Sequence, residues 1–507
     1  MYAKTYGETT CGIYGVTITV EVDVANGLPS FNIVGLPDLA VKESRERVKA
    51  ALKNSGYEFP GTKILVNLAP ADLKKDGSGL DLPIAIGILL ATKQLLLEEA
   101  ENYLFIGELA LDGKLRGIPG VLPMIIGAKE GGKKMVFIPE DNAAEGELVD
   151  GLEIYAPASL KEVVSHLKGE RKLSQLLKCQ LTHLDEELDE DFSDVKGQVV
   201  AKRALEIAAA GGHNLLMVGA PGSGKTMLAR RLRTILPPLT EEEALEVTKI
   251  YSVSGLLKHK GGLILDRPFR SPHHTVSRNA LVGGGRIPKP GEVTLSHKGV
   301  LFLDELPEFS RSALEVLRQP LEDGVVSISR VEASLTFPAD FILVAAENPC
   351  PCGFWQEEDE VHHCICTQAE VDRYQNKISG PLLDRIDMQI HVGRLKYEEM
   401  GSNTLGETSY TIRQRVIAAR NRQLARYRNA KARCNSMLTR REIKEYCQLD
   451  EGAQKILGQY FKSLGFSARN HDRIIKVAQT IADLAGMATI TMEHVTEAVL
   501  LRTSIQQ

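Results

Sequence analysis

The stretch Asn214-Leu-Leu-Met-Val218, which runs directly into Gly219-Ala-Pro-Gly-Ser-Gly-Lys-Thr226, decides the fold of this chain. It predicts a short buried strand, a glycine-rich turn and the start of a helix. Backbone N–H groups in such a turn can surround a phosphate, and the helix N-terminus adds partial positive charge. We therefore expect ATP here, with Lys225 at the β- and γ-phosphates and the Thr226 hydroxyl on Mg²⁺. The expected nucleotide-binding residues are Gly219, Ala220, Pro221, Gly222, Ser223, Gly224, Lys225 and Thr226.

A second apolar run, Val300-Leu-Phe-Leu303, ends in two carboxylates, Asp304 and Glu305. In nucleotide-hydrolysing folds the first such carboxylate holds the Mg²⁺ shell and the second polarises the attacking water. A fold of this kind can also bind nucleotide without hydrolysing it. The presence of Glu305 favours hydrolysis.

Three further polar residues refine this fold to the AAA+ class. Asn348 ends the strand predicted from Phe341 and suits a residue that orients water beside the γ-phosphate. Arg385, in Gly380-Pro-Leu-Leu-Asp-Arg-Ile-Asp387, suits an arginine that reaches a neighbouring subunit's γ-phosphate. Arg469 suits a residue of a helical lid that closes over ATP. Each arginine taken singly also fits an ordinary solvated side chain, but their order favours the catalytic roles. An arginine acting on a neighbour implies a ring, which we expect to be a hexamer.

Composition indicates a multidomain protein of the cytoplasm. The chain has 507 residues, 43% of them hydrophobic, and a net charge of −5, so any contact with nucleic acid must be local. The N-terminus has no signal-peptide pattern. The longest apolar stretch, 82–97, contains Lys93 and Gln94 and is too short for a membrane span, so we expect no membrane partner.

Periodicity divides the chain into an α/β part, a motor and a helical part. Residues 1–168 predict a mixed α/β domain, with strands at 16–24, 63–68 and 135–138 and helices at 40–53 and 83–97. Residues 169–191 read as an acidic linker, because like charges as dense as those at 185–191 resist compaction. The ATPase core is expected at 192–395, with a parallel sheet. A helical lid is expected at 410–507.

Several motifs resemble the YifB/ComM-type magnesium-chelatase-like AAA+ ATPases of bacteria. They are Arg270-Ser-Pro-His-His-Thr275, Gly283-Gly-Gly285, Pro290-Gly-Glu292, His297-Lys-Gly-Val-Leu-Phe-Leu-Asp-Glu305 and the segment 380–387. The resemblance implies a Lon-protease-like N-terminal domain, an AAA+ core and a chelatase-type C-terminal helical domain. It also implies ATP-driven branch migration of recombination intermediates during natural transformation, by hexamers on DNA.

Basic segments give this expectation independent support. The insert 269–299 carries Arg270, Arg278, Arg286, Lys289 and Lys298 against one acid, Glu292. The segment 324–337 alternates like a β-hairpin with Arg330 near its middle. In a ring such loops suit the phosphate backbone of DNA in the channel, although they could instead pack against the next subunit. The helix expected at 411–433 carries eight basic residues and no acid, which also favours an anionic partner: Arg413, Arg415, Arg420, Arg422, Arg426, Arg428, Lys431 and Arg433.

Four cysteines directly after Asn348 form two short pairs, Cys350 with Cys352 and Cys364 with Cys366. Four thiolates would make a closed structural Zn²⁺ site, with His362 or His363 as alternative ligands. The same pattern also fits reduced thiols in a loop, or a redox switch.

The N-terminal domain is expected to lack protease activity. The stretch around Ser78 resembles the serine loop of Lon-type proteases, but Leu122 stands where Lon has its lysine. A serine without a base is a weak nucleophile. Two alternatives to a DNA motor stay open: a chelatase-like motor that remodels a protein partner, and an ATP-dependent protease.

Overall fold

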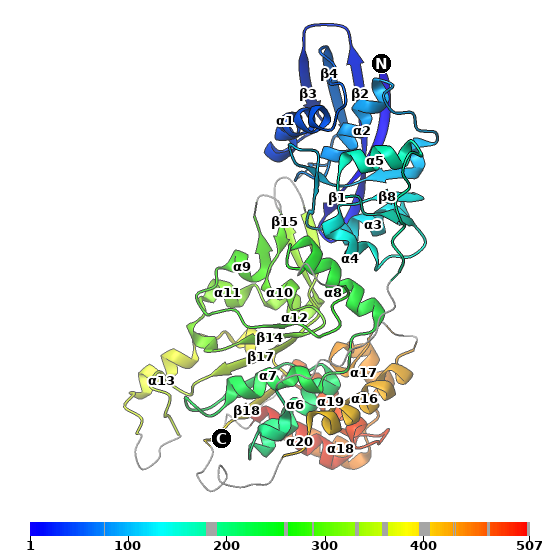
Figure 1. Cartoon of the computed structure of the whole chain (residues 1–507). Helices are drawn as coiled ribbons and strands as arrows, with labels where there is room; N and C mark the ends of the chain where they lie inside the picture. Colours follow the sequence, from blue (N-terminus) through cyan, green and yellow to red (C-terminus); the bar gives the residue numbers. More distant parts are fainter. Residues whose placement is uncertain are drawn as a thin grey trace. The chain divides into compact units, whose positions relative to one another are not determined.

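The computed structural model describes residues 1–75, 77–178, 190–257, 262–285, 288–329, 334–356, 363–394, 406–428, 430, 432–463 and 467–503. The chain forms two compact units (Figure 1). The first comprises Met1–His183 and Glu241–Ile264, and the second comprises Leu184–Thr240 and Leu265–Gln507. No helix in the described ranges is both long and apolar enough to cross a membrane.

A four-stranded sheet in the order β1-β2-β4-β3 forms the base of the first unit. From Ile18 to Val24 every second residue of β2 is buried, because successive side chains point to opposite faces of a strand. Helix α2 packs on β1 and β2, and helix α1 packs on α2. The elements are β1 (Tyr2–Cys11), β2 (Tyr14–Ala25), β3 (Ser30–Val34), α1 (Leu39–Asn54), β4 (Lys63–Ala69) and α2 (Asp81–Ala91).

A smaller parallel sheet, β5-β8-β9, a two-stranded β6-β7 sheet and further α-helices, including the short α4 (Ala143–Gly146), complete this unit. Helix α8 packs on α3, where the N–H of Gly120 donates to the Ser252 carbonyl at 3.0 Å and the Ser252 hydroxyl donates to Glu145 at 2.5 Å. This helix belongs to the first unit although it lies inside the stretch 192–395. The elements are β5 (Tyr103–Phe105), β6 (Glu108–Leu109), β7 (Leu115–Arg116), α3 (Val121–Glu130), β8 (Met135–Phe137), β9 (Glu153–Tyr155), α5 (Leu160–Leu167) and α8 (Glu241–Val253).

Most of the predicted elements of this unit form. The strands at 16–24 and 63–68 and the helix at 40–53 lie inside β2, β4 and α1. The helix expected at 83–97 instead ends at Ala91. Lys93 has a left-handed backbone with φ 58°, and the N–H of Gln94 turns back to the Leu89 carbonyl at 2.9 Å.

The second unit is built on a five-stranded sheet in the order β11-β14-β17-β10-β18, with every neighbouring pair parallel. All strands therefore end at one edge, called here the carboxyl edge, and start at the opposite amino edge. Helices α6 and α7 pack together beside this sheet. The elements are α6 (Val199–Gly211), β10 (Leu215–Val218), α7 (Lys225–Ile235), β11 (Phe269–Arg270), β14 (Val300–Leu303), β17 (Ile342–Glu347) and β18 (Met388–His391). The predicted α/β class with a parallel sheet is confirmed.

The C-terminal part of this unit is helical, as expected. Helix α19 begins at the Ser467 cap, whose hydroxyl accepts from the N–H of Asn470, and packs on α6, α16 and α20. Its buried residues, among them Val477 and Ile481, join the same apolar core as the strands. The helices are α16 (Ser409–Arg426), α17 (Arg440–Tyr446), α18 (Glu451–Ser463), α19 (Ala468–Leu484) and α20 (Met492–Thr503).

Two antiparallel ribbons extend from the sheet. One pairs β15 (Val325–Ser329) with β16 (Ser334–Pro338), which confirms the predicted hairpin. The other pairs β12 (Gly283–Gly284) with β13 (Lys289–Pro290) inside the basic insert. A Cβ on Gly283 would lie 3.1 Å from Ile328 of β15, so the two ribbons touch. Arg286 and Arg330 lie outside the described residues.

Candidate nucleotide site

The predicted nucleotide residues meet at the carboxyl edge. The glycine-rich turn follows β10, Asp304 and Glu305 follow β14, and Asn348 follows β17. Lys225 is the first residue of α7 and is 7% exposed. Its ammonium donates to the carbonyls of Gly219 at 2.6 Å and Ala220 at 3.0 Å, and to the Asn348 side-chain oxygen at 3.3 Å. The turn, the lysine and the sensor asparagine therefore form one cluster.

Two oxygen groups suited to Mg²⁺ lie side by side. The Thr226 hydroxyl donates to Oδ2 of Asp304 at 2.8 Å, although the two residues come from different motifs. The other carboxylate oxygen of Asp304 accepts from the N–H of Glu305 at 3.0 Å. Mg²⁺ prefers hard oxygen ligands of this kind and keeps several waters, so this pair fits the ion expected with ATP.

Glu305 has a partner that the sequence analysis did not assign. Nδ1 of His274 lies 3.2 Å from its Oε2, and the Glu305 side chain is 53% exposed. His274 belongs to a quoted motif, but it received no role. The sheet explains this contact. Strand β11 runs parallel to β14, so the residues that follow these two strands reach the same edge.

Arg385 and Arg469 lie at the opposite edge. Both line one pocket, together with Asn214, Phe341 and Asp387, which directly precede β10, β17 and β18. The four residues of β10 alone span about 13 Å, which exceeds the reach of an arginine side chain. The geometry therefore separates Arg469 from its own chain's nucleotide motifs, whereas the sequence reading placed it over its own ATP.

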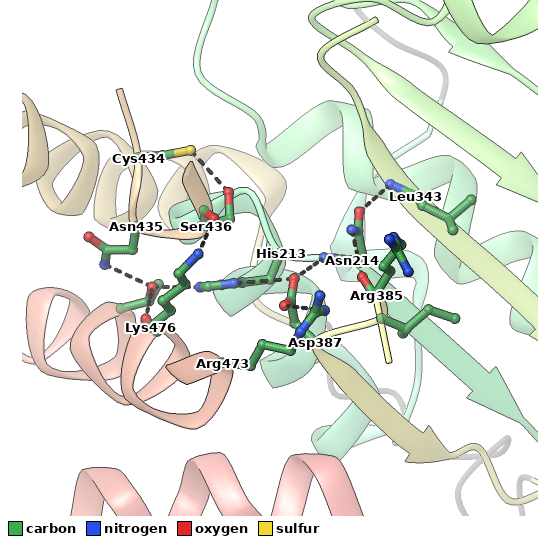
Figure 2. A network of polar contacts seen from close by, with 12 residues as sticks. His213, Asn214, Leu343, Arg385, Asp387, Cys434, Asn435, Ser436, Arg473 and Lys476 are labelled. Atoms are coloured by element: carbon green, nitrogen blue, oxygen red, sulfur yellow. Dashed lines mark hydrogen bonds and ion pairs between the residues drawn. The ribbon is translucent and has the colours of Figure 1, made fainter. Parts of the chain in front are cut away.

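A buried polar network holds this amino edge together (Figure 2). The Asp387 carboxylate accepts from the N–H of Asn214 at 3.0 Å and from Arg473 of α19 at 3.1 Å. The Asn214 side chain donates to the Arg385 carbonyl at 3.1 Å and accepts from the N–H of Leu343 at 2.9 Å. Burial alone would raise the pKa of Asp387, but the imidazole of His213, whose Nδ1 lies 3.6 Å from Oδ2, and the Arg473 charge lower it strongly. The network therefore ties the lid helix to the backbone of Arg385.

The four cysteines of the predicted cluster come together. The Sγ atom of Cys350 lies 3.3 Å from that of Cys352 and 3.8 Å from that of Cys364, and Cys352 and Cys364 are 3.6 Å apart. All four sulfurs, including that of Cys366, lie within 4.8 Å of one another. Four thiolates placed tetrahedrally about 2.3 Å from Zn²⁺ have neighbouring sulfurs about 3.8 Å apart. The cluster therefore has the dimensions of a Zn²⁺ site, and His362 lies outside the described residues.

The environments of the thiols differ. Burial and the neighbouring thiols raise the pKa of Cys364. The N–H of Cys352 lowers the pKa of Cys366, but burial and the neighbouring thiols outweigh it and raise that pKa to about 12. Burial opposes ionisation of Cys352, but the N–H groups of Ile365 and Phe354, with neighbouring thiols, lower its pKa to about 6. The N–H of Gly353 also donates to the sulfur of Cys350 at 3.2 Å. Donors directed at sulfur stabilise the thiolate form, which is the form that binds metals.

The basic helix α16 ends at Arg426, earlier than the predicted 433. The arginines of α16 itself make contacts within the chain that hold the lid to the core, whereas Arg428 and Arg433, beyond its end, are exposed. Arg415 pairs with Glu206 and Glu407, and Arg426 pairs with Asp483. Arg413, Arg420 and Arg422 donate to the carbonyls of Thr234, Ala209 and Asp483. Lys431 lies outside the described residues.

The described basic residues of the insert 269–299 fall into two groups, one paired with carboxylates and one exposed. Arg270 pairs with Glu292 at 2.6 Å, and Lys298 pairs with Asp340 at 2.7 Å. Arg278 and Lys289 are exposed, at the start of α9 (Arg278–Val282) and in β13. These two residues remain the described candidates for contact with an anion.

Ser78 has a carboxylate as its neighbour. Its hydroxyl donates to Glu108, while the ammonium of the fully buried Lys75 donates to the Pro70 carbonyl. Leu122 is buried in α3, and its N–H donates to Glu145 at 2.9 Å. A carboxylate supplies neither the charge nor the basicity of the lysine that Lon uses.

Comparison with known proteins places the whole chain in one group. Family profiles match residues 191–400 as "Magnesium chelatase, subunit ChlI", residues 20–142 as "Subunit ChlI of Mg-chelatase" and residues 406–502 as "Magnesium chelatase, subunit ChlI C-terminal". The chain is 45% identical to the uncharacterised protein YifB of Escherichia coli, over 97% of this chain and 95% of that protein. It is 43% identical to the competence protein ComM of Haemophilus influenzae, over 99% of this chain and 98% of that protein. It is 32% identical to the magnesium-chelatase 67 kDa subunit of Chlorobaculum parvum, over 31% and 23%.

Proposed function

Because this chain belongs to the magnesium chelatase subunit ChlI family, together with YifB and ComM, we propose that it is an ATP-hydrolysing ring motor that acts on DNA. One observation carries the proposal: Lys225, Thr226, Asp304 and Asn348 converge at the carboxyl edge. These are the groups that phosphoryl transfer to water requires.

Within this proposal each residue has a defined task. The turn 219–224 surrounds the phosphates, and Lys225 neutralises charge on the β- and γ-phosphates. Thr226 and Asp304 would hold Mg²⁺, and the ion would offset the negative charge of the phosphate oxygens. Glu305 polarises the attacking water, and Asn348 orients it.

The arginines complete the site in the next subunit. Arg385 and Arg469 face a pocket at the amino edge, so in a ring they act on the nucleotide of a neighbour. An always-charged guanidinium offsets the charge of the transition state there. The assembly is a homo-oligomer, and we expect six copies. We assign the ATPase core to 192–395, excluding the α8 segment, and the lid to 410–507.

DNA contact is assigned to the two ribbons. Arg278 and Lys289 are exposed in the insert that touches the β15–β16 hairpin. Basic loops of this kind bind the phosphate backbone irrespective of sequence. The name of the ComM relative, a competence protein, supports a role on recombination intermediates, and branch migration is the activity we propose.

A second candidate is a motor that remodels a protein partner, as a chelatase subunit would. The match to the magnesium-chelatase 67 kDa subunit favours it, over 164 residues only. The two functions differ in their response to DNA.

We also propose that the four cysteines hold a structural Zn²⁺ ion. The sulfur separations and the N–H donors support this assignment. Four thiolates fill a tetrahedral site, so the ion would have no open position for chemistry.

The test of the motor function is the steady-state ATPase rate with and without single-stranded, duplex and four-way-junction DNA, at two salt concentrations. Salt-sensitive stimulation by DNA is expected, and the Lys225→Ala variant serves as the inactive control. An ATPase that no DNA stimulates would contradict the DNA function and favour the protein-remodelling motor.

A further inference from the structure

The cysteine cluster lies against the nucleotide site. Asn348, which accepts from Lys225, is two residues before Cys350. On the other side of Cys352, a Cβ built on Gly353 would lie only 2.4 Å from Cδ of Pro221 in the glycine-rich turn. The loop 348–353 therefore touches both the ammonium that serves the phosphates and the turn that surrounds them.

The same loop is anchored on its far side. The carbonyl of Pro349 accepts from the side chain of Gln375 at 3.2 Å, at the end of α13 (Gln368–Gln375). The guanidinium of Arg394 lies over the Phe354 ring at 5.0 Å. Thr367, the N-cap of α13, directly follows Cys366, so the second cysteine pair is joined to the start of this helix.

From this arrangement we propose that Zn²⁺ bound to the four cysteines sets the geometry of the ATP site, so that metal occupancy controls ATP binding and turnover. The inference rests on the proposed ATPase function and on the proposed Zn²⁺ site. The ion joins the loop that carries Asn348 and Gly353 to the start of α13. Four short bonds from one ion fix the loop in position more tightly than two hydrogen bonds and one ring contact can.

Loss of the ion changes the nucleotide site in a specific way. Without it, the cysteine pairs are held together by thiol contacts and by N–H groups directed at sulfur, such as that of Ile365 at Cys352. These weak contacts do not fix Gly353 in position against Pro221. Asn348 then loses its register with Lys225. A displacement of about 1 Å in such a group lowers catalysis on the order of a hundredfold.

The variant for the test is Cys364→Ser with Cys366→Ser. The thiol of Cys364 contacts those of Cys350 and Cys352, and neither substituted cysteine belongs to the ATP contacts described above. The double variant therefore removes two metal ligands and keeps Asn348, Gly353 and Lys225. The matched control is Cys11→Ser in β1 of the first unit. Metal per chain is measured by mass spectrometry, affinity for a fluorescent ATP analogue by titration, and ATPase rate in excess Mg²⁺. Thermal unfolding identifies a variant that fails to fold.

A second route avoids substitution. The wild-type chain is stripped with a zinc-selective chelator, exchanged into buffer with Mg²⁺, and measured before and after Zn²⁺ is returned.

The expected result is about one Zn²⁺ per wild-type chain, none in the double variant, and at least tenfold weaker nucleotide binding without metal, restored by Zn²⁺. If Zn²⁺ binds but nucleotide affinity stays the same, the proposal that metal occupancy controls ATP binding is wrong. An absence of metal from the wild-type chain would overturn the site itself. If the wild-type chain hydrolyses no ATP, the motor function fails, while the nucleotide titration still decides this inference.

Discussion

Arg385 and Arg469 line the same pocket at the amino edge of the parallel sheet, whereas the glycine-rich turn of the same chain lies at the carboxyl edge. The lid helix α19 is fixed there by the contact of Arg473 with Asp387. In the proposed ring both arginines would act on the nucleotide of a neighbouring chain. Within its own chain the guanidinium of Arg385 pairs with Glu322 and donates to the Pro381 carbonyl, so it would exchange the Glu322 contact for the neighbour's phosphate.

The first prediction is complementation between two inactive variants. Arg385→Ala should lower the ATPase rate about a thousandfold, because the charge that offsets the transition state is lost. A Lys225→Ala subunit has no active site of its own but retains Arg385. Mixed assemblies of the two variants should therefore recover part of the wild-type rate, measured across mixing ratios.

The control for this experiment is Arg428→Ala, which removes an exposed arginine after α16. It should keep the wild-type rate alone and in mixtures. Mixed Arg385→Ala and Lys225→Ala assemblies without any activity would show that Arg385 does not act between subunits.

A second prediction concerns Gly353. Its backbone φ is 88°, and an added Cβ would collide with Pro221, so Gly353→Ala must displace the glycine-rich turn. Nucleotide affinity should fall about tenfold or more, measured by titration with a fluorescent ATP analogue. Gly324→Ala is the matched control, because φ there is 66° but nothing lies within 4 Å. It should cost about 1 kcal/mol of strain and leave nucleotide affinity unchanged. Equal affinities for both variants would contradict the contact.

Local sequence was sufficient for the nucleotide motifs because their geometry is set within a few residues. A strand, a turn and a helix start place Lys225, and a second parallel strand necessarily brings Asp304 to the same edge as Thr226. The side of the sheet that Arg469 faces depends on how the lid packs, which its own motif does not specify.

The contacts of the basic helix α16 could not be predicted for a related reason. Its charge excess is real, but its partners are distant in sequence, and several are backbone carbonyls that carry no charge to recognise. Arg413, for example, donates to the Thr234 carbonyl at 2.8 Å. Composition alone cannot distinguish an arginine that donates to a backbone carbonyl distant in sequence from an exposed arginine that could bind a phosphate.

A third prediction tests the buried Asp387. Its lowered pKa means that its stabilising contribution is complete above the pKa of the unfolded chain, about 4, and is lost as pH falls below that value. Asp387→Asn leaves Arg473 without its charge partner and should destabilise the second unit by about 3–5 kcal/mol at pH 7.

Urea unfolding from pH 7 to pH 3 measures this effect. The difference in free energy of unfolding between the wild type and Asp387→Asn should be constant at neutral pH and should narrow below about pH 4. The exposed Asp372→Asn in α13 should show little effect throughout. If this difference in free energy does not narrow in acid, the network does not hold Asp387 in its ionised form.

A fourth prediction concerns Glu8 in β1. Burial raises its pKa from 4.5 to about 8, and Thr17 and Lys133 offset this only in part. Between these two values the unfolded chain ionises Glu8 while the folded chain keeps it neutral. The stability of the first unit should therefore fall as pH rises, by about 1.4 kcal/mol for each pH unit. Glu8→Gln should remove this loss and be the more stable protein at pH 8, as measured by urea unfolding.

The control for Glu8 is the exposed Glu101→Gln, which should follow the wild type at every pH. A Glu8→Gln variant that loses stability with pH as steeply as the wild type would show that Glu8 is ionised in the folded protein.

The last prediction separates DNA contact from ATP chemistry. Arg278 and Lys289 are exposed in the insert and do not belong to the nucleotide cluster. Arg278→Glu with Lys289→Glu should therefore leave the basal ATPase rate unchanged and abolish most of its stimulation by DNA. Each lost phosphate contact should also reduce the slope of log affinity against log salt by about 1. The matched control is Lys455→Glu with Lys462→Glu on α18, which reverses the same number of exposed charges on the lid. If both double variants lose stimulation equally, the effect is one of net charge, and the insert is not the DNA-binding surface.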